Sequence, residues 1–256
     1  MLCGGGPSIK ADPRRNLWVW INSDQRKQIS IGGFVYNGGS KEGTYWYGGE
    51  PSITWRPLDN LTVTTDINYH RTFDTWANWS DFEPIENEQT GDMEYIMAEL
   101  NQETLGATIR LDYTITPTLS IQYYGSPYVS AGKYRNHMLV VEPQSGKFED
   151  RFDTFSNNEI AYNDEDNTWE IDNDNDGITN FIVDDTDFNY TQFNSNLVIR
   201  WEYKTGSSLY LVWSQNASES IDYEGDFNFG SDLGNMYRNS DFQNIVMLKF
   251  SYLFNI

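Results

Sequence analysis

Hydrophobic and polar residues alternate along most of the chain with a period of two. Between Ala107 and Thr116, the odd positions hold Ala, Ile, Leu and Tyr, whereas the even positions hold Thr, Arg and Asp. The same alternation recurs over 61–70, 196–204 and 246–256. Successive side chains of a β-strand point to opposite faces, so each segment is predicted to be a strand with one apolar and one polar face. No stripe of helical period persists, and the predicted fold class is all-β and antiparallel.

The pattern predicts about nine strands. They lie near 16–23, 28–36, 44–56, 60–70, 103–116, 119–131, 191–204, 207–216 and 244–256. Many are longer than the ~5 to 6 residues usual in soluble proteins. A transmembrane β-strand needs ~9 to 11 residues, with apolar and polar side chains alternating and aromatic residues at the membrane interfaces. Charged residues in mid-strand and Trp or Tyr near the strand ends therefore favour a transmembrane β-barrel of the outer-membrane type.

Short and long connections alternate along the chain. Short ones occur at 23–27, 57–60, 117–118 and 205–206, a Gly-rich one of intermediate length at 37–43, and long ones near 71–102, 135–190 and 217–243. Outer-membrane barrels have short periplasmic turns and long extracellular loops, so the long connections are predicted to be extracellular. The segment 93–102 reads either as an extra strand or as an extracellular extension.

An odd number of strands suggests that more of the barrel lies elsewhere. Bacterial single-chain barrels have an even number of strands. The chain also opens without the basic and apolar stretches of a signal peptide. We therefore expect residues 1–256 to form a single barrel segment, the C-terminal part of a larger barrel, with at least one strand before Met1.

Composition narrows the function classes. The chain has 256 residues, 38 of them acidic and 17 basic, which gives a net charge of −21 and argues against nucleic acid as a partner. No apolar run reaches the ~18 residues of a membrane-spanning helix. The single Cys3 excludes an internal disulfide. An aromatic content of 16% with a mean hydropathy of −0.63 suits carbohydrate-binding β proteins and barrels with a wet lumen.

Much of the negative charge belongs to one loop. Between residues 149 and 187 there are fourteen carboxylates and one base, Arg151. Within this loop Asp172, Asp174 and Asp176, followed by Gly177, have the spacing of the first oxygen ligands of a calcium loop. The twelfth position is Val183 and no flanking helices are expected, so the motif is not an EF-hand. It is a candidate Ca²⁺ site, and the alternative is a solvated acidic surface loop.

Charged residues at the polar positions of the strands form a second candidate site. Expected on the lumenal side are Arg110, Asp112, Arg200, Glu202 and Lys249. Paired charges that face water-filled space cost little, so these residues are expected to form a structural network or to select a solute. The two histidines, His70 and His137, are assigned structural roles. No catalytic residue is predicted, although a chain with 38 acids leaves paired carboxylates for glycan cleavage open.

Tryptophans in the long loops form the third candidate site. Trp76, Trp79 and Trp169 either stack on sugar rings or pack the loops over the barrel mouth.

Several segments resemble a known family. They are 5–10, 22–27, 108–134, 187–215 and the terminal 248–254. The resemblance is to Gram-negative outer-membrane proteins that join an N-terminal carbohydrate-binding module of the family-nine-like type to a C-terminal barrel domain of unknown function. The chain departs from that pattern at Lys204-Thr205-Gly206, where Arg-Pro-Gly is expected, and at the residues after Phe254. The resemblance implies an outer-membrane location and supplies no catalytic residues.

The leading hypothesis is an outer-membrane β-barrel without chemistry of its own, acting as scaffold or channel for a glycan-related system. Its expected partners are outer-membrane lipid, the barrel-assembly machinery, and other envelope proteins or glycans. The alternative is a soluble or surface all-β module that binds or cleaves carbohydrate. A third reading is a subunit of a larger envelope complex.

Overall fold

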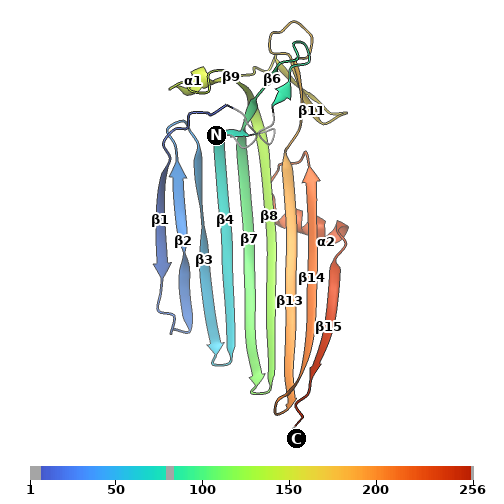
Figure 1. Ribbon diagram of the computed structural model, residues 1–256. Helices are drawn as coiled ribbons and strands as arrows, with labels where there is room; N and C mark the ends of the chain where they lie inside the picture. Colours follow the sequence, from blue (N-terminus) through green and yellow to red (C-terminus); the bar gives the residue numbers. More distant parts are fainter. Residues whose placement is uncertain (1–6, 79–83, 255–256) are drawn as a thin grey trace.

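A long antiparallel sheet dominates the fold. The computed structural model of the protein describes residues 7–78 and 84–254. In order across the sheet the strands are β1 (Arg15–Asn22), β2 (Ile29–Gly39), β3 (Tyr45–Leu58), β4 (Leu61–Asn78), β7 (Ile96–Thr116), β8 (Leu119–Val140), β13 (Phe188–Lys204), β14 (Ser207–Asp222) and β15 (Gln243–Ser251). Neighbours in the sheet are also neighbours along the chain, apart from the small elements inserted at one end (Figure 1). Each of the nine segments expected from the alternation overlaps one of these strands, and the all-β antiparallel class is confirmed.

Short and long connections lie at opposite ends of the sheet. The links from β1 to β2, β3 to β4, β7 to β8 and β13 to β14 are short and lie at the lower end in Figure 1. The link between β13 and β14 is Thr205-Gly206, in which Gly206 has a φ of +76°. Glycine adopts this left-handed conformation without a steric penalty, which permits the tight hairpin.

Several strands extend further into the long connections than the alternation indicates. β4 continues to Asn78, β7 begins at Ile96, and β8 continues to Val140. The segment 93–102 is therefore mainly an extension of β7, and Met93–Glu94 forms β6, which pairs with β5 (Ile85–Glu86). The strict alternation ends here because loops cover both faces of the strand tips, so apolar residues occupy both.

Two hydrophobic clusters account for this covering. On one side of β7, Ile96 and Ala98 pack with a small three-stranded sheet. This sheet consists of β10 (Ile160–Asn163), β11 (Thr168–Ile171) and β12 (Phe181–Asp184). Met97, which alternates with Ile96 and Ala98, packs instead with Met138 and Phe152. Phe152 begins β9 (Phe152–Thr154), which pairs with β8 and follows the short helix α1 (Phe148–Arg151).

A helix lies on one face of the sheet near the ends of three strands. α2 (Phe229–Asn239) contacts β8, β13 and β14, buries Met236, and brings Tyr237 to 5.4 Å from Phe193 between ring centroids. The side chain of Asn228 accepts a hydrogen bond from the backbone N–H of Ser231, which caps the helix N-terminus. The hydrophobic pattern of the sequence does not indicate this helix. The helix has eleven residues, two of them glycine, so its apolar stripe is too short to stand out.

The sheet has two edges in the part of the chain that the structure describes. β1 and β15 each pair with a single neighbour, and both run in the same direction (Figure 1). Every residue of both strands is exposed. Among the described residues, no helix combines the length and the apolar character needed to cross a bilayer.

Candidate functional site

The register of the strands shows that the long sheet has one mainly apolar face and one mainly polar face. One row of paired residues runs Trp55, Val63, Leu111, Tyr123, Leu197, Trp213 and Val246 from β3 to β15. The adjacent row on the opposite face runs Thr54, Thr64, Arg110, Tyr124, Asn196, Ser214 and Ile245. We call these the apolar face and the polar face. Because side chains alternate along each strand, the same division holds for successive rows.

The predicted charges all lie on the polar face and separate into two groups. In the first, Arg200 Nη2 lies 3.0 Å from Glu202 Oε2, and Arg200 Nε donates to Tyr210 Oη at 3.3 Å. Lys249 pairs with Tyr210 across β14 and β15, with its Nζ 5.6 Å from the centroid of the tyrosine ring. The Tyr210 side chain and the Glu202 carboxylate thus contact the positively charged side chains of Arg200 and Lys249 at the end of the sheet with short turns.

The second group lies on β7 and β8. The Arg110 guanidinium is 5.7 Å from the centroid of the Tyr124 ring, and Asp112 accepts a hydrogen bond from Gln122 Nε2 at 2.9 Å. Within the described residues no ion pair joins Arg110 to Asp112 or connects the two groups. The five charged residues therefore interact with nearby polar and aromatic side chains and do not form one continuous network.

Hollows lie along the polar face of the described strands. One of about 290 Å³ is lined by side chains of β8, β13, β14 and β15, including Asn194, Asn196 and Asn216. A neighbouring hollow of about 220 Å³ shares Tyr124 and Asn196 with it and includes Arg110 and Asp112. A third, of about 330 Å³, lies over β3, β4, β7 and β8. The polar face is therefore hollowed at more than one place.

Aromatic residues gather on the polar face next to the β1 edge, a feature that the sequence analysis missed. Trp18 pairs with Tyr36 and Trp20 pairs with Phe34 across β1 and β2. The two indoles lie 6.0 Å apart between centroids with an interplanar angle of 16°. Trp18 and Trp20 alternate with Leu17, Val19 and Ile21, so β1 is apolar on both faces, and this departure from the apolar–polar alternation is the signal that could have found them.

His70 fixes one member of this aromatic group. Its Nδ1 is hydrogen-bonded to Tyr36 Oη and its Nε2 to Thr72 Oγ1, both at 2.6 Å. The hydrogen bond from Tyr36 on β2 to His70 on β4 crosses over β3 at Gly48. Only glycine leaves room for it, because a Cβ at position 48 would come within 2.6 Å of Tyr36 Oη. Both ring nitrogens are thus engaged in positioning neighbouring side chains.

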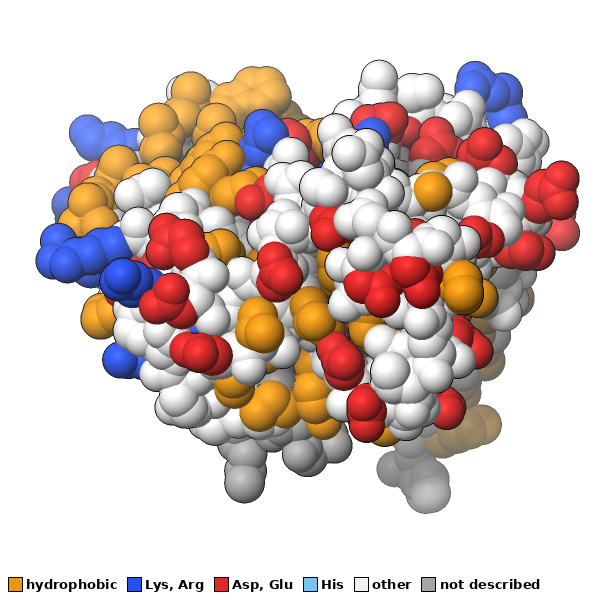
Figure 2. Space-filling view, turned by 90° about the horizontal axis from the view of Figure 1, so that it is seen from above, with side chains coloured by type: hydrophobic (Ala, Val, Ile, Leu, Met, Phe, Trp, Pro, Cys, Tyr) orange, Lys and Arg blue, Asp and Glu red, His pale blue; other side chains and the backbone are white. Residues whose placement is uncertain are grey.

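The acidic loop brings the three predicted calcium ligands together. One carboxylate oxygen from each of Asp172, Asp174 and Asp176 lies within 4.8 Å of the others. The Asp172 carboxylate also accepts hydrogen bonds from the backbone N–H groups of Asp176 and Gly177 at 3.1 and 2.8 Å, which closes the turn. Hard oxygen ligands so grouped suit Ca²⁺. Seen from the end with the long connections, acidic side chains are spread widely over the surface, with few Lys and Arg between them (Figure 2).

Comparison with known protein families assigns nearly the whole chain to one domain family. Residues 5–256 match the model of a domain of unknown function, DUF5916. The chain belongs to the DUF5916 family. A comparison with curated proteins found no match.

The predicted sugar-stacking tryptophans of this DUF5916 domain are partly buried where the structure describes them. Trp76 packs against the cluster of Met97, Met138 and Phe152, with its ring 6.0 Å from that of Phe152. Trp169 lies 5.0 Å from the His137 ring and 4.8 Å from the Tyr162 ring. Stacking on a sugar would compete with these contacts. Trp79 lies outside the described residues.

Two titratable groups beneath the acidic loop have shifted pKa values. His137 is 3% exposed, and burial together with the charge of Arg135 lowers the pKa of the imidazole to about 3, so it is neutral at pH 7. Burial raises the pKa of the Asp187 carboxyl, although the Tyr134 N–H at 2.7 Å and Arg135 at 2.9 Å favour its charged form. Asp187 thereby fixes the start of β13 against the end of β8.

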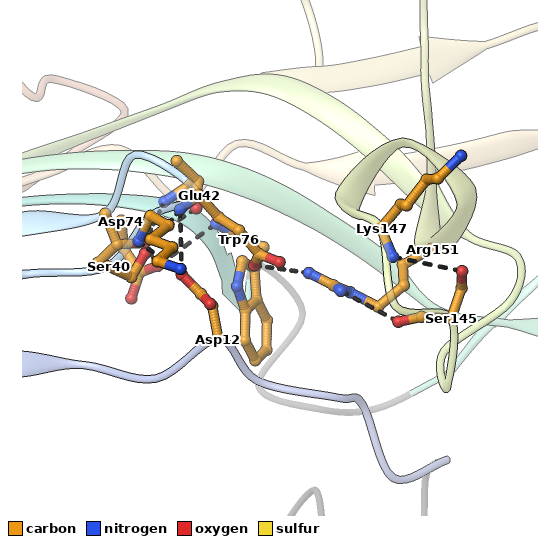
Figure 3. A network of polar contacts seen from close by, with 11 residues as sticks. Asp12, Ser40, Glu42, Asp74, Trp76, Ser145, Lys147 and Arg151 are labelled. Carbon is orange, nitrogen blue, oxygen red and sulfur yellow. Dashed lines mark hydrogen bonds and ion pairs between the residues drawn. The ribbon is translucent and has the colours of Figure 1, made fainter.

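A polar network fastens the segment before β1 to the rest of the DUF5916 domain (Figure 3). The Asp12 carboxylate accepts the backbone N–H groups of Lys41 and Glu42 at 2.5 and 3.2 Å. Glu42 in turn binds Arg151 Nη2 at 2.6 Å, and Arg151 is 1% exposed. The network therefore joins residue 12, the β2–β3 connection and α1 into one unit at the end with long connections.

Proposed function

We propose that this domain is a segment of an outer-membrane β-barrel that serves as scaffold or channel for a glycan-related envelope system. The apolar face contacts lipid and the polar face lines a wet lumen. The observation that carries the proposal is the apolar face, which crosses all nine long strands and bears aromatic residues toward both ends.

Aliphatic side chains occupy the middle of the apolar face and are exposed. Ile53, Ile67 and Ile109 are 50%, 43% and 42% exposed, and Leu248 is 68% exposed. An apolar surface of this extent is unfavourable in water at roughly 25 cal/mol per Å², and monomeric soluble proteins rarely expose so large a patch. Hydrocarbon is the solvent that suits it.

Aromatic residues border this middle region on the same face. Toward the short turns lie Trp55, Tyr113, Tyr123, Trp201, Tyr203 and Tyr252, and toward the long connections lie Tyr47, Tyr69 and Phe193. Trp201 and Phe193 are eight residues apart on β13, about 26 Å along the strand at ~3.3 Å per residue, or about 20 Å along the membrane normal at a tilt of ~40°. Outer-membrane barrels have an apolar band of about 25 Å between two aromatic girdles.

The two edges bear on the larger architecture. Open edges do not occur in the hydrocarbon region, because unpaired backbone groups cost several kcal/mol each there. β1 and β15 run in the same direction, so closing the sheet with antiparallel pairs needs an odd number of further strands. We therefore propose that the domain is one part of a larger barrel, assembled by the barrel-assembly machinery.

The alternative of a soluble or surface carbohydrate module draws on the hollows of the polar face. It accounts for the polar face but leaves the exposed apolar face in water. Membership of an envelope complex would instead place that face against a partner barrel.

Electrophoretic mobility with and without heating tests the proposal. Protein extracted from outer-membrane fractions is run in detergent with and without boiling, and its mass is measured. A heat-dependent shift with an intact mass well above 29.7 kDa supports a barrel of which this domain is one part. A species of 29.7 kDa in the soluble fraction without any shift would overturn the proposal and favour the soluble carbohydrate module.

A further inference from the structure

We infer that two neighbouring rows of side chains on the polar face of β8, β13, β14 and β15 form a binding site for a neutral, hydroxyl-rich ligand of the oligosaccharide class. This inference deepens the proposed function and rests on it for the position of the site in the lumen wall. The first row is Ser126, Asn194, Asn216 and Gln243, and the second is Tyr124, Asn196, Ser214 and Ile245.

The register places these side chains around a single hollow. Asn194 pairs with Asn216, which pairs with Gln243, while Asn196 pairs with Ser214, which pairs with Ile245. Both rows lie on the same face because their members are two residues apart on each strand. Seven of the eight residues line the hollow of about 290 Å³, Ser126 being the exception. A volume of this size is near the lower end for small-molecule sites.

The lining offers hydrogen-bonding groups that the protein does not use. Among the described residues, the side chains of Asn196, Ser214 and Gln243 make no hydrogen bond to the protein, and Asn216 Nδ2 donates to Asn194 Oδ1. That single bond leaves the Asn194 amide group and the Asn216 carbonyl oxygen available. Amide and hydroxyl groups both donate and accept, which matches the hydroxyls of a sugar.

The absence of charge from the hollow indicates a neutral ligand. Of the residues that line it, none is acidic or basic. The net charge of −21 disfavours anions, and a site for a cationic ligand would hold carboxylates, as the hollow over β3 and β4 does with Glu50 and Asp66. The Tyr124 ring and the Ile245 side chain supply apolar surface, which suits the C–H face of a sugar ring.

A neighbouring hollow indicates an elongated ligand. The hollow of about 220 Å³ shares Tyr124 and Asn196 with the first and continues onto β7. Arg110 lies over Tyr124 and Asp112 binds Gln122, so the charges there already have partners. A chain of two or more sugar units can therefore extend from one hollow into the next.

Calorimetric titration with defined oligosaccharides tests the inference on the full-length protein in detergent. The probes are maltohexaose, cellohexaose and chitohexaose, with hexagalacturonate as the anionic counterpart. We expect at least one neutral hexasaccharide to bind, and hexagalacturonate to bind at least tenfold more weakly. Asn196→Leu combined with Asn216→Leu should weaken the binding at least tenfold, because both amides face the hollow. Asn101→Leu, an exposed asparagine on the apolar-face side of β7, should leave the affinity unchanged.

The outcomes separate this inference from the proposed function. Lack of binding by all three neutral hexasaccharides, tighter binding of hexagalacturonate, or unchanged affinity in the double variant overturns the site. If the double variant does not fold, Gln243→Leu at the exposed edge strand provides the same comparison. Heat-dependent mobility is measured on each sample. A shift without binding overturns the site and leaves the barrel in place, whereas binding without a shift overturns the barrel role and its lumenal placement.

Discussion

The Arg151 guanidinium is the most deeply buried charge among the described residues, and Glu42 is its partner from 109 residues earlier in the chain. Arg151 also donates to the Ser145 carbonyl oxygen at 3.2 Å, and its Nε has no hydrogen-bond partner among the described residues. Removing one member of a buried pair leaves an uncompensated charge, which costs more than the pair contributes. The Glu42 carboxylate therefore compensates the buried positive charge of Arg151 and offsets the cost of removing that charge from water.

Glu42→Ala should destabilise the end of the molecule with long connections by about 3 kcal/mol. The reason is that Arg151 stays buried without its carboxylate. Hydrogen exchange at α1 and β9 should report the loss as faster exchange of their amides. Glu149→Ala, at an exposed glutamate of α1, is the matched control and should leave exchange unchanged. Equal exchange in the two variants would contradict the role given to Glu42.

Protonation of His137 should loosen the loop core as the pH falls. The pKa of the folded imidazole is about 3, against about 6.5 in the unfolded chain. Between these values the unfolded form binds more protons, so the stability contribution is full above pH 6.5 and decreases by up to about 1.36 kcal/mol per pH unit below it. Amide exchange of β11, whose Trp169 contacts His137, should therefore accelerate from pH 6.5 to 4 once corrected for intrinsic rates.

His137→Gln provides the control because glutamine does not titrate in this range. Its exchange should lack the histidine contribution to the pH dependence and keep that of the carboxylates, among them Asp187. The raised pKa of Asp187 has the opposite sign, since a carboxyl that prefers its protonated form gains stability as the pH falls. Parallel pH profiles in the two proteins would show that His137 does not control the loop core.

At the scale of elements, period-two alternation predicted the nine long strands because each has one wet and one apolar face. The prediction fails at the tip of β7, where Ile96, Met97 and Ala98 are all buried. Loops cover both faces there, so the local sequence carries no alternation. The pairing of Glu42 with Arg151 could not be predicted either, because it depends on where two distant connections meet. The three aspartates of the acidic loop, in contrast, lie close together in sequence, and local turn geometry suffices to group them.

The connection between β11 and β12 should become ordered when Ca²⁺ binds. Asp172, Asp174 and Asp176 bring three carboxylates within 4.8 Å, and a cation would relieve their mutual repulsion. Ca²⁺ titration should slow amide exchange over residues 172–178, and Asp174→Asn should weaken binding at least tenfold. Asp164→Asn, at an exposed aspartate of the same acidic segment, is the control. Absence of any calcium effect on the parent protein would favour a solvated acidic loop.

At the scale of the whole molecule, the two faces and the two edges of the sheet both favour a β-barrel in a membrane. The loop clusters bury the tips of β7 and β8, and α2 covers the apolar face around Phe193, but the rest of the long sheet has no second layer among the described residues. A sheet without a covering layer needs a solvent that suits each face. Lipid on one side and water on the other meet that need, and further strands would complete the pairing at β1 and β15.

Two adjacent residues of β13 test this assignment of faces. Leu197 lies on the apolar face, midway between Phe193 and Trp201, whereas Val198 lies on the polar face in the row of Asp112 and Gln122. Leu197→Arg should destabilise the folded barrel in bilayers by about 2–4 kcal/mol, because it places a cation near the membrane midplane. Val198→Arg should change the stability little, since the new guanidinium meets water and Asp112. The stability of both variants is measured by urea unfolding in lipid vesicles, with the heat-dependent mobility shift used to quantify the folded fraction. Equal destabilisation by the two substitutions, or a larger effect at Val198, would show that the apolar face does not contact lipid.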